Sequence, residues 1–179
     1  MKLNKKGQSF SLEGILSYVI FLAIFAVILF LWSSVTTTII ESEETYKVKE
    51  LSDNIVESLI RNPGIPRNWT PANVEVIGLA KEPRILDENK VLSFVGMMNY
   101  SSGNYTINKH KLNLGRRGYN FEFFFKITNT TGNVITLNNR SLVCGLEPRN
   151  ATLIHTVIRT AILNDEMVKI YFTLWVPEL

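Results

Sequence analysis

Residues 14–40 read GILSYVIFLAIFAVILFLWSSVTTTII, and this stretch decides how the chain is organised. Seventeen of the eighteen residues from Ile15 to Trp32 are apolar, and all 27 residues of the stretch are uncharged. As a helix they extend about 40 Å, which exceeds the roughly 30 Å hydrocarbon core of a bilayer. A removable secretory signal has a shorter apolar region followed by a small-x-small site, and the residues after Trp32 match that pattern poorly. The stretch therefore predicts a retained transmembrane helix.

The charges on the two sides of this stretch predict its orientation. A basic leader of residues 1–7 precedes it with three lysines, and the residues just after Ile40 include three glutamates. Lysine and arginine near a membrane span favour the cytoplasmic side. We therefore expect a single-pass protein of the cell membrane, with a cytoplasmic N-terminus and an extracellular C-terminal domain.

The leader also accounts for the whole net charge. The chain has 19 basic and 16 acidic residues, a formal net charge of +3, and Lys2, Lys5 and Lys6 all lie in the leader. The remaining residues carry 16 charges of each sign (19 − 3 = 16). Binding of nucleic acid needs a basic face on the folded domain, so no nucleic-acid partner is expected.

The helix is predicted to continue beyond the membrane, over residues 8–62. Apolar residues recur three or four positions apart along its second part and form a single stripe. They are Val48, Leu51, Ile55 and Leu59. Asn62-Pro63-Gly64 then ends the helix, because proline lacks an amide hydrogen and disfavours helix at the residue before it.

Residues 63–179 change to the pattern of strands and turns. Val74–Leu79 and Tyr119–Thr128 are candidate strands, and a short helix capped by Asp87 is expected to end near Met98. The strongest signal is a hairpin: alternating residues from Ile154 to Ile162 and from Val168 to Val176 flank Asn164-Asp165-Glu166. The predicted fold class is α+β, with the long helix packed on a C-terminal antiparallel β-sheet domain.

No pattern typical of an enzyme or a cofactor site is present in the sequence. It lacks a glycine-rich phosphate loop, HExxH and GxSxG, and its single cysteine, Cys144, permits no internal disulfide and no metal-ligand spacing. We expect no catalytic, cofactor-binding or metal-binding residues, and no enzymatic activity.

The junction between leader and helix carries the most specific motif. Lys5-Lys6-Gly7-Gln8, then Ser9-Phe10-Ser11-Leu12-Glu13 and an uninterrupted apolar helix, resembles the class III signal of type IV pilins, particularly the archaeal pilin-like proteins. The resemblance implies cleavage between Gly7 and Gln8 by a prepilin peptidase on the cytoplasmic side of the membrane. It also implies that the helix stays on the mature protein and packs against copies of itself or other pilin-like subunits.

Glu13 is the charged residue at the edge of the apolar helix. The resemblance implies that this carboxylate pairs with the α-amino group of a neighbouring subunit and sets the register of assembly. The alternative is that Glu13 lies in the lipid headgroup region. Glu13 is the sixth residue counted from Gln8, whereas the family usually has glutamate at the fifth. Cleavage after Gln8 restores the fifth position, so both cleavage sites stay open.

Six Asn-x-Ser/Thr sequons follow the helix and none precedes its end. Their asparagines are Asn68, Asn99, Asn104, Asn129, Asn139 and Asn150. Chance predicts roughly 2.5 sequons for this composition of 17 asparagines and 26 serines and threonines in 179 residues. N-glycosylation of an extracellular surface explains them, and so does the ordinary use of asparagine and threonine in turns.

These observations support two functional hypotheses. The first is a pilin-like structural subunit that is anchored by its N-terminal helix, processed by the peptidase and assembled into a surface filament or pseudopilus. The alternative is a signal-anchored surface glycoprotein that does not polymerise and binds a ligand or another cell through its β domain. Cleavage after Gly7 together with a requirement for Glu13 favours the first.

Overall fold

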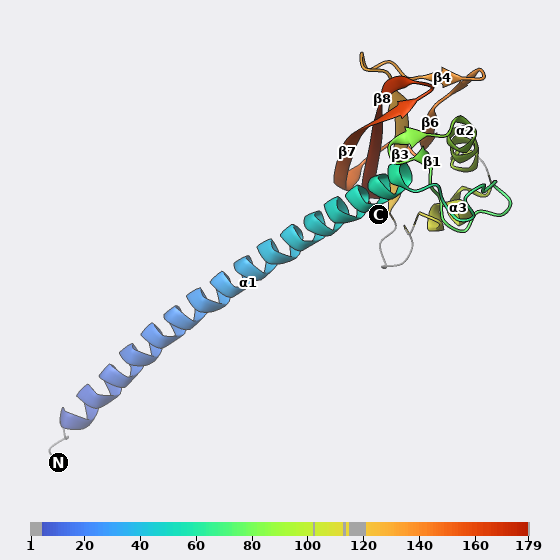
Figure 1. The fold of residues 1–179 in the computed structure, drawn as a ribbon. Coiled ribbons are helices and arrows are strands. Elements are labelled where there is room, and N and C mark those ends of the chain that lie inside the picture. The colour runs from blue at the N-terminus through green and yellow to red at the C-terminus, as the bar shows by residue number, and fades with distance from the viewer. Residues whose placement is uncertain (1–4, 102, 113, 115–120, 179) are drawn as a thin grey trace. The chain divides into compact units, whose positions relative to one another are not determined.

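A computed structural model gives the fold for residues 5–101, 103–112, 114 and 121–178. The chain divides into two compact units, Met1–Glu44 and Thr45–Leu179, and each is taken by itself below. Helix α1 (Lys5–Arg61) runs without interruption from the first unit into the second (Figure 1). This confirms the long helix that the sequence predicts, with its end one residue earlier.

The first unit consists of the apolar part of α1. Leu12–Thr36 is long and apolar enough to cross a membrane, with a mean hydropathy of 2.8, and none of its residues is buried within the chain. A membrane anchor and a signal sequence both fit these properties. The helix has apolar side chains on every side, which is stable in lipid or against other apolar helices but not in water.

In the second unit, the last turns of α1 supply one wall of the hydrophobic core. Val48, Ile55 and Leu59 are buried as the predicted stripe requires, and Leu51 is half-buried. The buried face is wider than that stripe, because Ser52, Val56 and Ile60 are each 0% exposed. A sheet covers more of a helix surface than a single neighbouring helix does, which accounts for the wider face.

The domain is built around a six-stranded sheet with the order β1-β2-β7-β8-β3-β6. Its strands are β1 (Ala80–Glu82), β2 (Ile85–Leu86), β3 (Glu122–Thr128), β6 (Val143–Gly145), β7 (Ala151–Leu163) and β8 (Glu166–Pro177). The prediction of a fully antiparallel sheet is wrong at one place, because β2 pairs with β7 in parallel, at Ile85 and Ile162. The chain reverses direction between β1 and β2, and this turn leaves β2 parallel to β7. The fold is α+β with a mixed sheet.

The predicted hairpin is the longest pairing in the sheet. β7 and β8 pair antiparallel from Leu163 and Glu166 outward. Asn164 and Asp165 alone make the turn, at φ of 53° and 64°, the left-handed values that a two-residue type I′ hairpin needs. The inward residues of β7 are the odd-numbered ones, so Ile154 and Ile158 lie on the outer face, 56% and 50% exposed.

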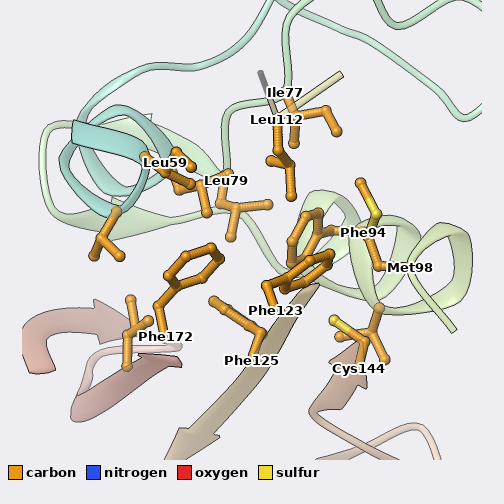
Figure 2. Packing of buried hydrophobic residues seen from close by; sticks show 14 of the residues in the cluster. Leu59, Ile77, Leu79, Phe94, Met98, Leu112, Phe123, Phe125, Cys144 and Phe172 are labelled. Atoms are coloured by element: carbon orange, nitrogen blue, oxygen red, sulfur yellow. The ribbon is translucent and has the colours of Figure 1, made fainter. Parts of the chain in front are cut away.

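Strand β3 confirms the alternation predicted for Tyr119–Thr128 from Phe121 onward, and residues 119 and 120 lie outside the described part of the chain. Phe121, Phe123, Phe125 and Ile127 are all buried on the core face. The rings of Phe123 and Phe172 stack with centroids 5.5 Å apart, and Phe94 from helix α2 (Glu88–Met97) meets Phe125 edge-on at 5.1 Å. Figure 2 shows Leu59 of α1 and Leu79 packed next to the rings of Phe172 and Phe123.

The remaining elements test the weaker expectations. The helix predicted after Asp87 is confirmed, since the Asp87 carboxylate accepts a hydrogen bond from the Lys90 amide at 3.1 Å and caps α2. The strand predicted at Val74–Leu79 is wrong: only Val76 forms an isolated bridge, with Ile65. This segment instead packs Val74, Ile77 and Leu79 into the core from an irregular backbone. A short apolar run does not distinguish these two arrangements.

Three short elements have no clear signal in the sequence. They are helix α3 (Tyr105–His110) and the two-stranded ribbon of β4 (Thr136–Leu137) and β5 (Arg140–Ser141). Val134, two residues before β4, forms only an isolated bridge, with Thr128. Asn138 and Asn139, both with positive φ, make the turn of the ribbon.

Candidate functional site

The apolar surface of α1 is the largest feature of the chain that its own fold leaves uncovered. Large side chains are exposed on all sides of the helix, from Leu12 at 71% to Trp32 at 74%. Phe21 and Phe25, one turn apart, stack with ring centroids 6.1 Å apart. Gly14 has open space where a Cβ would lie, so no side chain of the described chain packs there. This surface therefore requires lipid or other chains as its environment.

The junction predicted to be cleaved lies at the start of the same helix. Gly7 and Gln8 are within α1, and their side chains are outside the described residues. Glu13 is exposed and lies inside the membrane-competent segment Leu12–Thr36, one residue from its start. Among the side chains that the structure describes, which exclude those of residues 1–11, none forms a hydrogen bond or an ion pair with the Glu13 carboxylate. A carboxylate at the edge of an apolar segment needs a charged or polar partner, or contact with the headgroup layer of a membrane.

The six sequon asparagines all lie in the second unit. Five are exposed, namely Asn68, Asn99, Asn104, Asn139 and Asn150, and Asn129 is half-buried. All five are therefore accessible for modification, which the expectation of glycosylation requires.

Turn geometry explains four of these asparagines without a glycan. Asn99 accepts a hydrogen bond from the Ser101 amide at 3.0 Å, and Asn129 accepts one from the Thr131 hydroxyl at 2.7 Å. Asn139 and Asn150 adopt positive φ, which asparagine tolerates better than most residues. Asn68 and Asn104 have neither feature among the described residues, although Asn104 precedes α3. These two are the sequons that local structure explains least.

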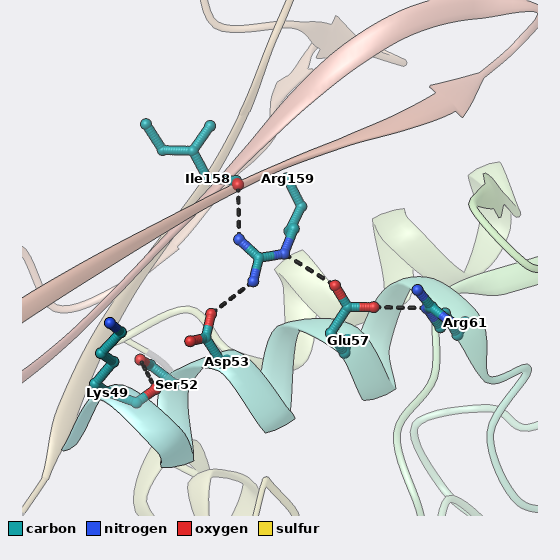
Figure 3. Close-up of polar contacts among 7 residues, drawn as sticks. All are labelled: Lys49, Ser52, Asp53, Glu57, Arg61, Ile158 and Arg159. Carbon is teal, nitrogen blue, oxygen red and sulfur yellow. Dashed lines mark hydrogen bonds and ion pairs between the residues drawn. The ribbon is translucent and has the colours of Figure 1, made fainter. Parts of the chain in front are cut away.

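A cluster of ion pairs joins α1 to the sheet, and the sequence analysis did not anticipate it. The Arg159 guanidinium of β7 donates to Glu57 Oε1 at 2.9 Å and to Asp53 Oδ1 at 2.7 Å, and Arg61 pairs with Glu57 Oε2 at 2.6 Å (Figure 3). The hydrogen bond from Arg159 lowers the pKa of Glu57 and raises that of Arg159, although partial burial opposes both shifts. We call these four residues the α1–β7 clamp. Arg159 lies at an inward position of β7, which the alternation in the sequence did not distinguish from an outward one.

A second polar cluster lies beneath α3. Lys109 Nζ and the Tyr105 hydroxyl each donate to the Glu122 carboxylate at 2.6 Å, and the Lys109 side chain is only 6% exposed. Burial and the adjacent carboxylate raise the pKa of Tyr105. Each buried polar group has its partner, so the cluster is explained by structural hydrogen bonding.

A groove of about 380 Å³ lies beside the last turns of α1, within the second unit. Its apolar lining includes Leu51, Ile55 and Leu59 from α1 together with Ile77 and Leu112. Its polar lining residues are Lys47, Glu50, Asn54, Ser58 and Lys111. Lys111, Leu112 and Phe121 border residues 113 and 115–120, which lie outside the described part of the chain.

The described residues contain no group of three or more His, Cys, Asp or Glu side chains that can hold a metal ion. Cys144 is buried against the core, and burial raises the pKa of its thiol well above the ordinary value. No protein family, curated protein or solved structure matches this chain. Its function must therefore be argued from its own residues.

Proposed function

We propose that this chain is a membrane-anchored, pilin-like structural subunit without enzymatic activity. In this proposal a prepilin peptidase removes residues 1–7 on the cytoplasmic side, and α1 stays on the mature protein. The subunit then assembles through that helix, with copies of itself or with other pilin-like subunits, into a surface filament or pseudopilus. The domain from Thr45 onward lies outside the cell.

The observation that carries the proposal is the continuity of α1. One helix has an apolar segment, Leu12–Thr36, that is exposed on every side, and ends in a segment whose residues Val56, Leu59 and Ile60 belong to the core of a folded domain. A removable signal has no reason to be continuous with a structural element of the mature domain. This continuity supports an anchor that is kept.

The chemistry of an all-apolar helix supports assembly from a membrane pool. Such a helix is stable in lipid and also when packed on other apolar helices, so moving between the two environments costs little free energy. Cleavage at the leader leaves this segment intact and creates a new α-amino group close to Glu13. An amine and a carboxylate buried together are far less costly than either charge alone.

The deciding experiment is to determine the mature N-terminus of protein recovered from the cell surface. Intact mass and N-terminal sequencing distinguish the outcomes. A chain that starts at Gln8 supports the proposal, and a chain that starts at Ser9 supports it with Glu13 at the fifth position. A chain that starts at Met1, or near Val35 after ordinary signal cleavage, contradicts it.

The groove favours a second candidate function, that of a surface glycoprotein that binds a ligand or another cell through its β domain without polymerising. A groove lined by both apolar and charged side chains, as this one is by Leu51, Ile77 and Lys111, can hold a small ligand. This function predicts that the protein remains in the membrane fraction as single subunits and that no filament can be sheared from the cells.

A further inference from the structure

Strand β7 has a free edge along most of its length. β8 pairs with it on one side, and on the other side β2 reaches only Ile162, whose amide donates to Arg84 O at 2.8 Å. No other strand in the described part of the chain pairs with the residues before Ile162. In Figure 1, β7 and β8 lie side by side, and β7 extends well beyond the short strands at its other edge.

The direction of the Ile162 amide shows which backbone groups lie on this free edge. Successive residues of a strand direct their N–H and C=O groups to opposite sides. Ile154, Thr156, Ile158 and Thr160 therefore direct theirs to the same side as Ile162, away from β8. Among the described residues, Arg159 Nη1 donates a hydrogen bond to one carbonyl of this row, Ile158 O, at 3.1 Å. The rest of the row is a template for another strand.

The outward-facing side chains along this edge have the same order in either direction of the strand. Thr156 is the centre, with Ile154 and Ile158 on its two sides. An antiparallel partner related by a two-fold axis at Thr156 places Thr156 opposite its own copy and Ile154 opposite Ile158 of the partner. Pairs of β-branched residues pack well across antiparallel strands. A two-fold contact between identical chains needs this kind of self-complementary surface.

Charge does not oppose such a contact. Edge strands are commonly protected by lysine or proline, and neither occurs from Thr152 to Thr160. Arg159 is the charged residue in this segment, and Asp53 and Glu57 of its own chain neutralise it. Two copies therefore meet without like charges opposite each other. An axis at Ile158 instead places Ile154 opposite Ile162, where β2 already occupies the edge.

The size of the contact determines where it can form. Nine residues of strand extend about 30 Å, and a sheet edge about 10 Å thick gives roughly 300 Å² per copy. A stable interface buries about 800 Å² per partner, so this edge alone is too small to hold a dimer in dilute solution. Anchoring in one membrane, as proposed above, raises the effective concentration of the copies and makes a weak contact sufficient.

We propose that the free edge of β7 joins two membrane-anchored copies of this chain, which pair antiparallel around a two-fold axis at Thr156. This contact lies in the folded domain and is separate from assembly through the apolar helix. It extends the six-stranded sheet of one copy into that of the other.

Cysteine cross-linking in the full chain, in cell membranes, tests both the contact and its register. Cα atoms of a hydrogen-bonded antiparallel pair lie about 5.5 Å apart, within the range that a disulfide bridges. Thr156→Cys should give a disulfide-linked dimer under mild oxidation. Thr160→Cys is the matched control, because it changes an exposed threonine on the same edge but lies about 26 Å from its own copy in this register. The wild-type chain controls for Cys144, which is buried.

The expected result is at least fivefold more dimer from Thr156→Cys than from Thr160→Cys. Adding Ile158→Lys to Thr156→Cys should remove that difference, because it places a charge at the contact. Equal dimer from both cysteine variants, or a dimer from Ile158→Cys in place of Thr156→Cys, overturns the proposal. A chain found in the membrane fraction without the Thr156→Cys dimer also overturns it and leaves the anchor intact. A chain absent from the membrane fraction overturns the anchoring on which the contact rests.

Discussion

Arg159 in β7 and Glu57 in α1 are 102 positions apart in the sequence, and a hydrogen bond of 2.9 Å joins Arg159 Nε to Glu57 Oε1. Because Asp53 accepts from the same guanidinium, one side chain of the edge strand contacts two successive turns of the helix. Both carboxylates are about one-third exposed, so water screens the attraction between the charges. The α1–β7 clamp therefore fixes the rotation of the helix on the sheet more than it adds to stability.

Arg159→Met should lower the free energy of unfolding by about 1–2 kcal/mol, because it keeps the apolar stem and removes both hydrogen bonds. Urea unfolding of the full chain in detergent, followed by fluorescence of the buried Trp69 and Trp175, measures the change. Lys81→Met is the matched control, since Lys81 is exposed, and it should change stability by less than about 0.5 kcal/mol. Equal effects of the two variants would show that the clamp contributes nothing.

The destabilisation by Arg159→Met should also depend on pH. In the folded chain the pKa of Glu57 lies below its ordinary value of 4.5, chiefly because Arg159 donates a hydrogen bond to it. The unfolded chain therefore binds a proton first as pH falls, and the stability that Glu57 contributes is present above pH 4.5 and lost below it. Unfolding at pH 7 and at pH 3.5 should show a larger difference between wild type and Arg159→Met at pH 7. A difference that grows in acid would contradict this assignment.

Glu13→Gln should leave processing and membrane insertion unchanged and reduce assembly. If the carboxylate pairs with the α-amino group of a neighbouring subunit, its loss leaves a buried amine without a counter-charge, which costs about 3 kcal/mol or more per contact. Glu13→Lys should be worse, because it places two positive charges together. The measurement is the polymer sheared from cells compared with the protein kept in the membrane. Normal filament yield from both variants would place Glu13 in the headgroup region.

If the sequons are modified, Asn68 and Asn104 should carry glycans, because local hydrogen bonding does not explain asparagine at these positions. Asn68→Gln and Asn104→Gln should each reduce the mass of the surface protein by one glycan, while folding is retained. Asn129→Gln is the contrasting variant: it should leave the mass almost unchanged and destabilise the turn that Asn129 holds with Thr131 and Asn133. Intact mass spectrometry measures all three. A wild-type mass equal to that of the bare polypeptide would leave turn geometry as the whole explanation.

Gly78→Ala should destabilise the domain, because a Cβ there would lie 2.2 Å from Asn62 O and 2.4 Å from the Gly64 amide nitrogen. Both are backbone atoms at the exit from α1, so relief requires movement of the main chain, and we expect a loss of about 2–3 kcal/mol. Gly103→Ala, where a Cβ meets nothing within 4 Å, is the control and should change stability little. Thermal unfolding of both variants checks the difference.

The sequence predicts those helices and strands whose hydrophobic periodicity extends over many residues, because a few residues that break the pattern do not hide it. The helix to Arg61, the capped helix after Asp87 and the β7–β8 hairpin were all clear from periodicity and turn residues. The parallel pairing of β2 was not, because it rests on a single pair of residues. Nor did the pattern show that the even-numbered residues of β7 face outward: isoleucine alternates there with threonine, while the inward set includes Arg159 and His155.

The candidate sites also divide into those formed by residues close together in the sequence, which could be predicted, and those formed by distant residues, which could not. The apolar helix and the sequons are local in sequence and could be found there, although only the fold separates Asn68 and Asn104 from the asparagines that hold turns. The α1–β7 clamp, the groove and the free edge of β7 arise from residues far apart in the chain. Periodicity carries no information on which distant elements meet, so these features required the structure.

The order in which the ribosome makes the chain gives the core stripe of α1 a further consequence. Glu57 is synthesised 102 residues before Arg159, and at about 5–20 residues per second the delay is about 5–20 s. During this time Val48, Val56 and Leu59 have no sheet to cover them, while the apolar segment before them is ready to enter a membrane. These core residues of the nascent helix are therefore uncovered before their own domain exists, and β8, which is made after Arg159, completes the core.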